Sequence, residues 1–203
     1  MTLKDVKINF LVDMATDLFM ARSVNEVTIK DIAVAAQVGE ATIYRYFGNK
    51  QNIVVQAAMK LKNIVNADYF QVNDKMNGYQ ELEAFYMSYY NIFINHPDFY
   101  KFLSEFDAYM TGENSDVLNP YEDAIDQYKH AYMYAYQEGL KDGSVKKQQD
   151  IEMFYFSTTH AVLELCKKLS LKAVLHQDTE IEKASQLKCL IEIILNNLKS
   201  LWV

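Results

Sequence analysis

The chain has 203 residues, 50% of them hydrophobic, and a formal net charge of −7. This length and apolar content allow a substantial core, which excludes a disordered or low-complexity protein. With six glycines, two prolines and long stretches of helical spacing, the chain is predicted to be all-α, without strands.

The charge is unevenly divided along the chain. Residues 1–65 hold eight basic and six acidic side chains, a net of +2, whereas the remaining 12 bases and 21 acids give −9. An acidic body would be repelled by a polyanion, which only the N-terminal part could approach. No uncharged apolar run reaches the roughly 18 to 20 residues that a membrane-spanning helix needs, so we expect none.

The first expected helix runs from about Leu3 to Ala21. It carries an apolar stripe that should face the core, formed by Val6, Phe10, Met14 and Leu18 and widened by Leu11, Ala15 and Phe19.

A tight turn then joins two short helices. Thr28 is a good N-cap for the first of them, and Asp31, three residues later, approximates a capping box. That helix should stop near Gln37, and Gly39 should start the next one. The apolar residues expected to point inward are Ile29, Ile32, Ala33 and Ala36.

The helix that follows Gly39 has one apolar and one polar side. Ile43 and Phe47, spaced i and i+4, should face the preceding helix. Its outward residues are Thr42, Tyr44, Arg45 and Tyr46. Such a helix is too short to be stable alone and too polar outside to be core, which indicates an element presented to a partner. Asn49 can cap a fourth helix that continues to about Phe70, and Lys50 lies beside its start, where free N–H groups can bind phosphate.

Five more helices are expected, at about residues 79–95, 97–110, 121–140, 149–175 and 178–201, with the clearest loop at 111–120. The last two have two apolar faces each, so one face could pack within the protein and the other against a second copy. The predicted dimer interface comprises Phe154, Val162, Leu165, Leu169, Leu187, Ile191, Ile194 and Leu198. We therefore expect an N-terminal domain of residues 1–48 and a helical body of residues 49–203.

Nine residues between positions 28 and 50 follow a known helix-turn-helix pattern in register and without gaps: Thr28, Ile32, Ala33, Ala36, Val38, Thr42, Tyr44, Phe47 and Lys50. Upstream, Ala15, Leu18 and Phe19 match the first helix of the same pattern. This stretch resembles the DNA-binding region of the TetR family of bacterial transcriptional regulators, whereas the last three quarters of the chain matches only as a helical body of suitable length. The resemblance implies a ligand-responsive regulator, by family habit a repressor, which binds a palindromic operator as a homodimer and needs no cofactor.

By that resemblance, residues 40–47 would enter the major groove of double-stranded DNA. Phosphates would be bound by Thr28, Thr42, Tyr44, Tyr46 and Lys50, and base edges would be faced by Ala41 and Arg45. Arg45 is the best candidate for direct base recognition because its guanidinium matches O6 and N7 of guanine. Tyr44 could instead pack beneath the fourth helix. Glu40 could either stabilise the helix start or accept a hydrogen bond from a cytosine amino group.

Four positions depart from the family pattern. Ser23 and Gln37 stand where the family has glycine, Gly39 replaces a capping serine, and Ala41 replaces a glycine. If the turn at Gln37 requires a positive φ, a residue other than glycine costs roughly 1 kcal/mol there. The change at Gly39 is nearly neutral because glycine caps acceptably.

The expected helices between residues 79 and 140 are unusually aromatic. In the family, the larger domain binds a small molecule that releases DNA, and a ring-lined pocket here would suit a flat hydrophobic effector that can also be cationic. A tyrosine-rich core is the alternative explanation for any single ring. The predicted pocket residues are Phe85, Tyr89, Phe93, Phe102, Phe106, Tyr109, Tyr128, Tyr132 and His160.

Other function classes find less support in the sequence. The histidines are scattered, and no HExxH, GxSxG or glycine-rich phosphate loop indicates an enzyme. Cys166 and Cys189 lie in apolar patterns without CxxC spacing, which favours reduced, buried thiols in a cytoplasmic protein. His160 could be a core residue, a ligand contact or one member of a metal site. A helical protein-interaction or small-molecule-binding module would leave the outward polar cluster at residues 42–50 unexplained.

Overall fold

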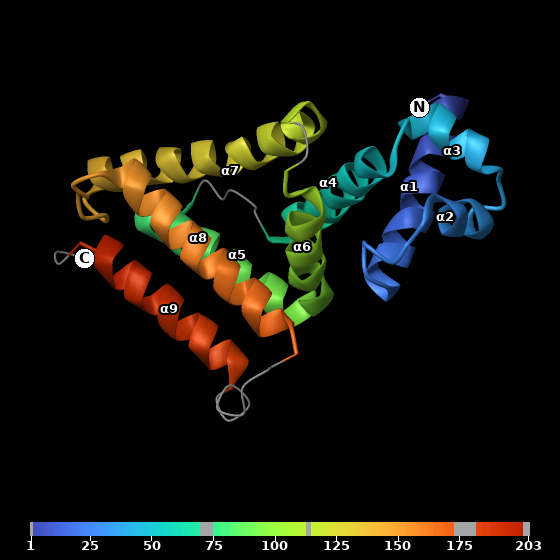
Figure 1. Ribbon diagram of the computed structural model, residues 1–203. Coiled ribbons are helices and arrows are strands. Elements are labelled where there is room, and N and C mark those ends of the chain that lie inside the picture. Colours follow the sequence, from blue (N-terminus) through green and yellow to red (C-terminus); the bar gives the residue numbers. More distant parts are fainter. Residues whose placement is uncertain (1, 70–74, 113–114, 173–181, 201–203) are drawn as a thin grey trace. The chain divides into compact units, whose positions relative to one another are not determined.

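The computed structural model describes residues 2–69, 75–112, 115–172 and 182–200, and nearly all of this part of the chain is helical (Figure 1). The helices are α1 Leu3–Ala21, α2 Ile29–Ala35, α3 Glu40–Phe47, α4 Lys50–Tyr69, α5 Gly78–Asn95, α6 Pro97–Met110, α7 Ser115–Asp142, α8 Ile151–Ser170 and α9 Lys183–Leu198. The predicted all-α class is confirmed. Residues 173–181 and 201–203, into which the last two expected helices extend, lie outside the described part of the chain.

The chain forms two compact units. The first combines residues 1–64 with 101–124, and the second combines residues 65–100 with 125–203. The first unit is therefore larger than the predicted DNA-binding domain of residues 1–48, because it also contains most of α4, most of α6 and the start of α7.

Helix α1 has the predicted ends, but its inward face differs from the prediction. Its buried residues are Leu11, Val12, Ala15, Thr16 and Phe19. Val6 and Phe10, which we expected inside, are 44% and 46% exposed. Two apolar stripes overlap on this helix, and the one that contains the small Ala15 packs against the protein because a small residue allows close helix contact. Thr16 is accommodated there because its hydroxyl donates to the Val12 carbonyl at 2.7 Å.

The turn between α2 and α3 follows its sequence signals. The Thr28 hydroxyl accepts from the Asp31 N–H at 3.1 Å and the Asp31 carboxylate accepts from the Thr28 N–H at 2.8 Å, which confirms the capping box. Gln37 has φ 55°, so the turn does place a residue other than glycine in the left-handed region, at a cost of about 1 kcal/mol. The Val38 N–H then donates to the Ala33 carbonyl at 2.9 Å and closes the turn.

Helix α7 begins earlier than predicted. It starts at Ser115, so the part of the predicted loop between residues 115 and 120 is helical and Pro120 lies inside the helix. Proline removes only one N–H from the helical ladder, which here is the donor that would reach residue 116 in the first turn. The loss of one hydrogen bond is small near a helix end, so the helix can begin before Pro120. The prediction that the loop continues to residue 120 was wrong for that reason.

The second unit packs α5 against both α8 and α9 (Figure 1). Helices α5 and α7 meet through two glycines, because a Cβ added to Gly78 would lie 2.1 Å from the Gly139 nitrogen. An isolated antiparallel bridge between Val145 and Lys199 fastens the end of α9.

Six of the eight residues predicted for a dimer interface are buried in the core of the protomer. They are Val162, Leu169, Leu187, Ile191, Ile194 and Leu198. Their helical spacing reflects the packing of α8 and α9 with α5, which one sequence stripe cannot distinguish from contact with a second copy. Phe154 and Leu165 are half-buried.

Candidate nucleic-acid interface

Helix α3 is held by its apolar side and shows its polar side to solvent. Ile43 is fully buried and Phe47 is 8% exposed, as predicted. The Asn52 side chain in α4 donates to the Phe47 carbonyl at 2.6 Å, which satisfies a carbonyl at the end of α3. These contacts fix the rotation of α3 about its axis and therefore which residues face outward.

The outward side of α3 carries most of the residues predicted to contact DNA. Glu40, Ala41, Tyr44 and Arg45 are exposed, and Thr42 and Tyr46 are half-buried. Tyr44 is 51% exposed, so much of its phenol lies open to solvent. The Arg45 guanidinium lies 5.0 Å from the centre of the Tyr46 ring. This cation–π contact restricts the arginine and pre-orients it for a flat partner.

Glu40 occupies the first turn of α3, directly after its N-cap Gly39, which makes no side-chain cap bond. A carboxylate there is favoured by the positive end of the helix dipole. Because Glu40 is also exposed, both roles considered for it, helix stabilisation and base recognition, remain compatible with its position.

At the start of α2, Thr28 is exposed but its hydroxyl is occupied. Besides accepting from the Asp31 N–H, it donates to the Asp31 carboxylate at 2.8 Å. The hydrogen bond from the Thr28 N–H is the main cause that lowers the pKa of Asp31. Arg22, which the sequence interpretation overlooked, lies 3.5 Å from Asp31 and donates to the Glu26 carbonyl at 3.1 Å. Its charge offsets an acidic group that would otherwise repel a phosphate.

Lys50 is half-buried and its ammonium is occupied within the first unit. It donates to the Val24 carbonyl at 2.5 Å and lies 4.7 Å from the centre of the Tyr109 ring. Burial lowers the pKa of Lys50, and the nearby Asp31 opposes that shift. Tyr109, which we predicted in the effector pocket, thus contacts the start of α4.

A second overlooked cation lies on α2. Lys30 is exposed at the second position of that helix, between the buried Ile29 and Ile32. The helical spacing of the apolar residues alone places Lys30 on the side of α2 opposite its apolar stripe.

The geometry of α2, the turn and α3 agrees with a comparison of the sequence with known families. Residues 11–57 match the family described as bacterial regulatory proteins, tetR family. The N-terminal part of the chain thus matches the DNA-binding region of the TetR family. Members of this family are bacterial regulatory proteins.

The individual relatives of the chain are distant. The HTH-type transcriptional repressor KstR2 of Rhodococcus jostii (strain RHA1) is 24% identical over 147 residues, which are 71% of each chain. The ketosteroid regulator KstR2 of Mycobacterium tuberculosis has a TM-score of 0.65 and 15% identity, over 95% of both chains. A regulator from Saccharomonospora viridis in complex with choline has a TM-score of 0.68 and 18% identity, over 95% of this chain and 97% of that one. At these identities the two structures establish a shared fold.

The residues predicted for an effector pocket are distributed over both units of the chain. Phe102, Phe106 and Tyr109 belong to the first unit, and Phe85, Tyr89, Phe93, Tyr128, Tyr132 and His160 belong to the second. Phe85 and Tyr132 pack edge to face, with ring centres 5.2 Å apart. His160 is exposed and lies beside the Phe156 ring, so it does not line a buried pocket in this structure.

Buried phenols of the second unit satisfy one another. The Tyr86 hydroxyl lies 2.6 Å from the Thr158 hydroxyl and 3.3 Å from the Tyr132 hydroxyl. Burial raises the pKa of Tyr86, Tyr128 and Tyr132, and raises that of Tyr155 to about 12. Thr158 and Tyr155, on α8, were not predicted as partners of these rings because no local pattern links them to α5 and α7.

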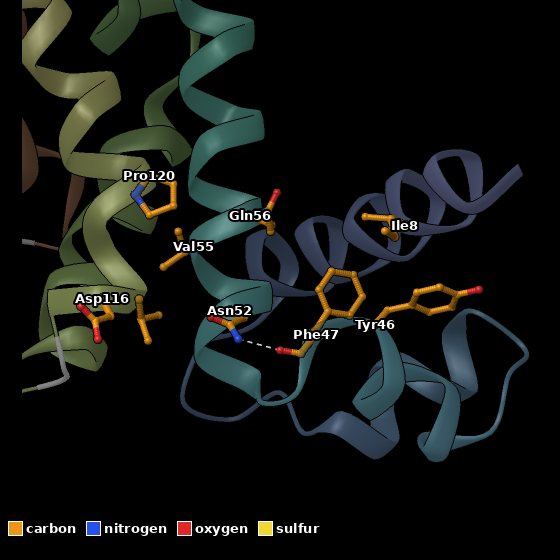
Figure 2. Close-up of a pocket in the computed structure, with 9 residues that line it drawn as sticks. Ile8, Tyr46, Phe47, Asn52, Val55, Gln56, Asp116 and Pro120 are labelled. Atoms are coloured by element: carbon orange, nitrogen blue, oxygen red, sulfur yellow. Dashed lines mark hydrogen bonds between the residues drawn. The ribbon is translucent and has the colours of Figure 1, made fainter. Parts of the chain in front are cut away.

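A cleft of about 290 Å³ lies in the first unit, next to α3. Figure 2 shows its lining, which is Ile8, Tyr46, Phe47, Asn52, Val55, Gln56, Asp116, Val117 and Pro120. None of these is among the predicted pocket residues. Tyr46 and Phe47 show that the cleft reaches the end of α3.

Cys166 is buried, as predicted, and burial raises its pKa to about 12, whereas Cys189 is exposed and that part of the prediction was wrong. Cys189 lies on the outer side of α9, one turn before the exposed Ile193. In the described part of the chain, no cluster of three His, Cys, Asp or Glu side chains could hold a metal ion, and none of the described helices is long and apolar enough to cross a membrane.

Proposed function

We propose that this regulator is a ligand-responsive repressor in the cytoplasm that binds a palindromic operator as a homodimer. The observation that supports it most is the outward side of α3, where Tyr44 and Arg45 are exposed while Ile43 and Phe47 anchor the helix. A solvated helix of eight residues with an exposed, ring-stacked arginine is suited to the major groove.

The side chains of α3 divide into two roles. Arg45 recognises guanine through its two-pronged guanidinium, and Ala41 contacts a neighbouring base edge. Thr42, Tyr44 and Tyr46 bind phosphates and set the register of the helix on the duplex. Glu40 lies at the N-terminal tip of α3. Its carboxylate accepts a hydrogen bond from a cytosine amino group and therefore disfavours other bases. Thr28 caps the start of α2 and so holds that helix end beside the same phosphate path.

The experiment is selection of bound sequences from a random duplex library at low salt. Two identical half-sites about 10 to 11 base pairs apart, or a multiple of that spacing, are expected from a two-fold dimer. Arg45→Ala should lose preference at one base pair in each half-site, and Tyr44→Phe should keep the preference while binding more weakly. If no sequence is enriched, and no duplex is bound, the protein is a helical interaction module rather than a repressor.

A homodimer is supported by apolar side chains that remain exposed on the last two helices. Met153 and Phe156 on α8 and Ile193 on α9 are 63%, 41% and 55% exposed. A second copy packed against α8 and α9 would bury these large apolar groups. Met153→Glu and Ile193→Glu should each shift the sedimentation coefficient to that of a monomer, whereas Val6→Glu on α1 should not.

The effector is a small hydrophobic molecule, and a positive charge is compatible with it. The aromatic helices of the second unit support this class, and a structural relative was solved with choline while another is a ketosteroid regulator. Choline, a long-chain quaternary amine and a neutral steroid should be compared for release of the operator. Release by one of them, with a rise in melting temperature, would identify the class, and no response to any of the three would reject it.

A further inference from the structure

The segment between α1 and α2 is held by side chains from two distant helices. The Val24 N–H donates to the Glu105 carboxylate at 2.7 Å. The Val24 carbonyl accepts from the Lys50 ammonium at 2.5 Å. Val24 itself is fully buried. Both backbone groups of one buried residue are therefore satisfied by charged groups, and such charge-assisted bonds are stronger than neutral ones.

Tyr109 completes this arrangement. It lies four residues after Glu105 on α6 and therefore on the same side of that helix. Its ring centre is 4.7 Å from the Lys50 ammonium, which gives the cation a second favourable contact in a half-buried place. We call Lys50, Glu105 and Tyr109 the Val24 clamp.

The clamp holds the chain just before the DNA-binding helices. Val24 precedes Thr28, the N-cap of α2, by only four residues, and α2 packs directly on α3. A displacement at Val24 would therefore change the position of α2 and α3 relative to the rest of the first unit. An error of about 1 Å in the placement of recognition groups is enough to weaken directional hydrogen bonds.

The position of Lys50 argues against a primary role as a phosphate ligand. A phosphate-binding lysine offers a solvated ammonium on a flexible stem, whereas this ammonium is occupied by a carbonyl and a ring, and its burial lowers its pKa. We propose that Lys50, Glu105 and Tyr109 are positioning residues for DNA binding, and that Lys50 acts through Val24 rather than by neutralising a phosphate. This proposal rests on operator binding by the chain.

The salt dependence of operator affinity separates the two roles of Lys50. Loss of one phosphate contact lowers the slope of log affinity against log salt by about 1 per subunit. Loss of a positioning contact lowers affinity at every salt concentration and leaves the slope unchanged. Lys50→Met and Glu105→Ala should each weaken binding roughly tenfold, with the wild-type slope, because each breaks a charge-assisted hydrogen bond.

Conservative variants provide matched controls. Glu105→Gln keeps an oxygen that accepts from Val24 and should bind within about threefold of wild type. Tyr109→Phe keeps the ring and should also bind normally, whereas Tyr109→Leu should resemble Glu105→Ala. The double variant Lys50→Met/Glu105→Ala should be no more than slightly weaker than either single variant, because both act on one residue.

Amide hydrogen exchange tests the clamp in the DNA-free protein. The Val24 N–H should exchange slowly in the wild type and in Glu105→Gln, and clearly faster in Glu105→Ala, with unchanged exchange in α8. A lower salt slope in Lys50→Met together with wild-type affinity in Glu105→Ala would overturn the proposal and make Lys50 a phosphate ligand. Absence of duplex binding by the wild type would instead reject the proposed function, and the Val24 exchange would then still decide whether the clamp exists.

Discussion

Helices α2 and α3 differ from the aromatic helices α5, α7 and α8 in what their polar groups do. On α3, two buried side chains hold the helix and Tyr44 and Arg45 remain open to solvent. In the second unit, the hydroxyls of Tyr86, Tyr132 and Thr158 bond to one another. Exposed polar groups on an anchored helix indicate a partner, whereas an excess of aromatic residues is equally compatible with a well-satisfied core.

The close packing of the second unit can be broken at one glycine. Gly78→Ala places a Cβ 2.1 Å from the Gly139 nitrogen, so α5 and α7 must separate, at a cost of about 1 to 3 kcal/mol. Chemical denaturation of the variant and the wild type measures this difference. The matched control is Gly39→Ser in the open turn, where a Cβ meets nothing within 4 Å and stability should change by only a few tenths of a kcal/mol. Equal stability of the two variants would contradict the contrast between the units.

Alkaline pH should destabilise the aromatic core before it affects the turn. Burial raises the pKa of Tyr155 to about 12 from the usual 10.0, so the folded state favours the neutral phenol. This stabilisation is fully present below about pH 10 and is lost as the pH rises toward 12. Denaturation midpoints between pH 8 and 11.5 should fall more steeply for the wild type than for Tyr155→Phe. Parallel curves for the two proteins would show that this phenol is not buried as described.

The hydroxyl network itself contributes a smaller, measurable amount. Tyr86→Phe removes the group that joins Thr158 and Tyr132 and should cost about 1 kcal/mol of unfolding free energy. Thr158→Val and the double variant complete a cycle, in which the double variant should lose less stability than the sum of the two single losses. If Tyr86→Phe were as stable as wild type and bound effector more weakly, these phenols would belong to a polar pocket rather than to the core.

Relief of backbone strain in the turn between α2 and α3 should give the smallest change in stability. Unlike the changes above, it should stabilise the protein. Gln37 has φ 55°, so Gln37→Gly should stabilise the protein by up to about 1 kcal/mol, or roughly 2 to 4 °C in melting temperature. Gly48, with φ 77°, is the reverse control, because Gly48→Ala adds strain without a steric clash and should lower the melting temperature. A Gln37→Gly variant that melts below the wild type would show that the turn is not strained.

The features predicted correctly from sequence depend on neighbouring residues. The capping box of Thr28, the start of α3 after Gly39 and the start of α6 at Pro97 each follow from groups within four positions of one another. Local hydrogen bonding and backbone preference decide such features, and nothing distant overrides them here.

The features that were missed depend on residues far apart in the chain. Val24 and Glu105 are 81 positions apart, so no spacing rule could pair them or show that Lys50 is occupied. The same reason applies to the stripe at Leu187 and Ile191, which periodicity marks as apolar without showing that it faces its own chain. The exposure of Val6 and Phe10 was missed for a different reason, because two overlapping apolar stripes on α1 fit the helical spacing equally well.

Operator affinity against salt concentration, for the wild type and Arg45→Ala, tests the central claim most directly. A dimer that neutralises about 6 to 10 phosphates should lose roughly 10³ to 10⁵ in affinity between 50 and 200 mM salt. Arg45→Ala should keep most of that slope but bind the selected operator and a variant changed at the guanine with nearly equal affinity, a loss of about 1 to 3 kcal/mol of discrimination. Affinity that is independent of salt, or discrimination that survives in Arg45→Ala, would contradict DNA recognition by the outward side of α3.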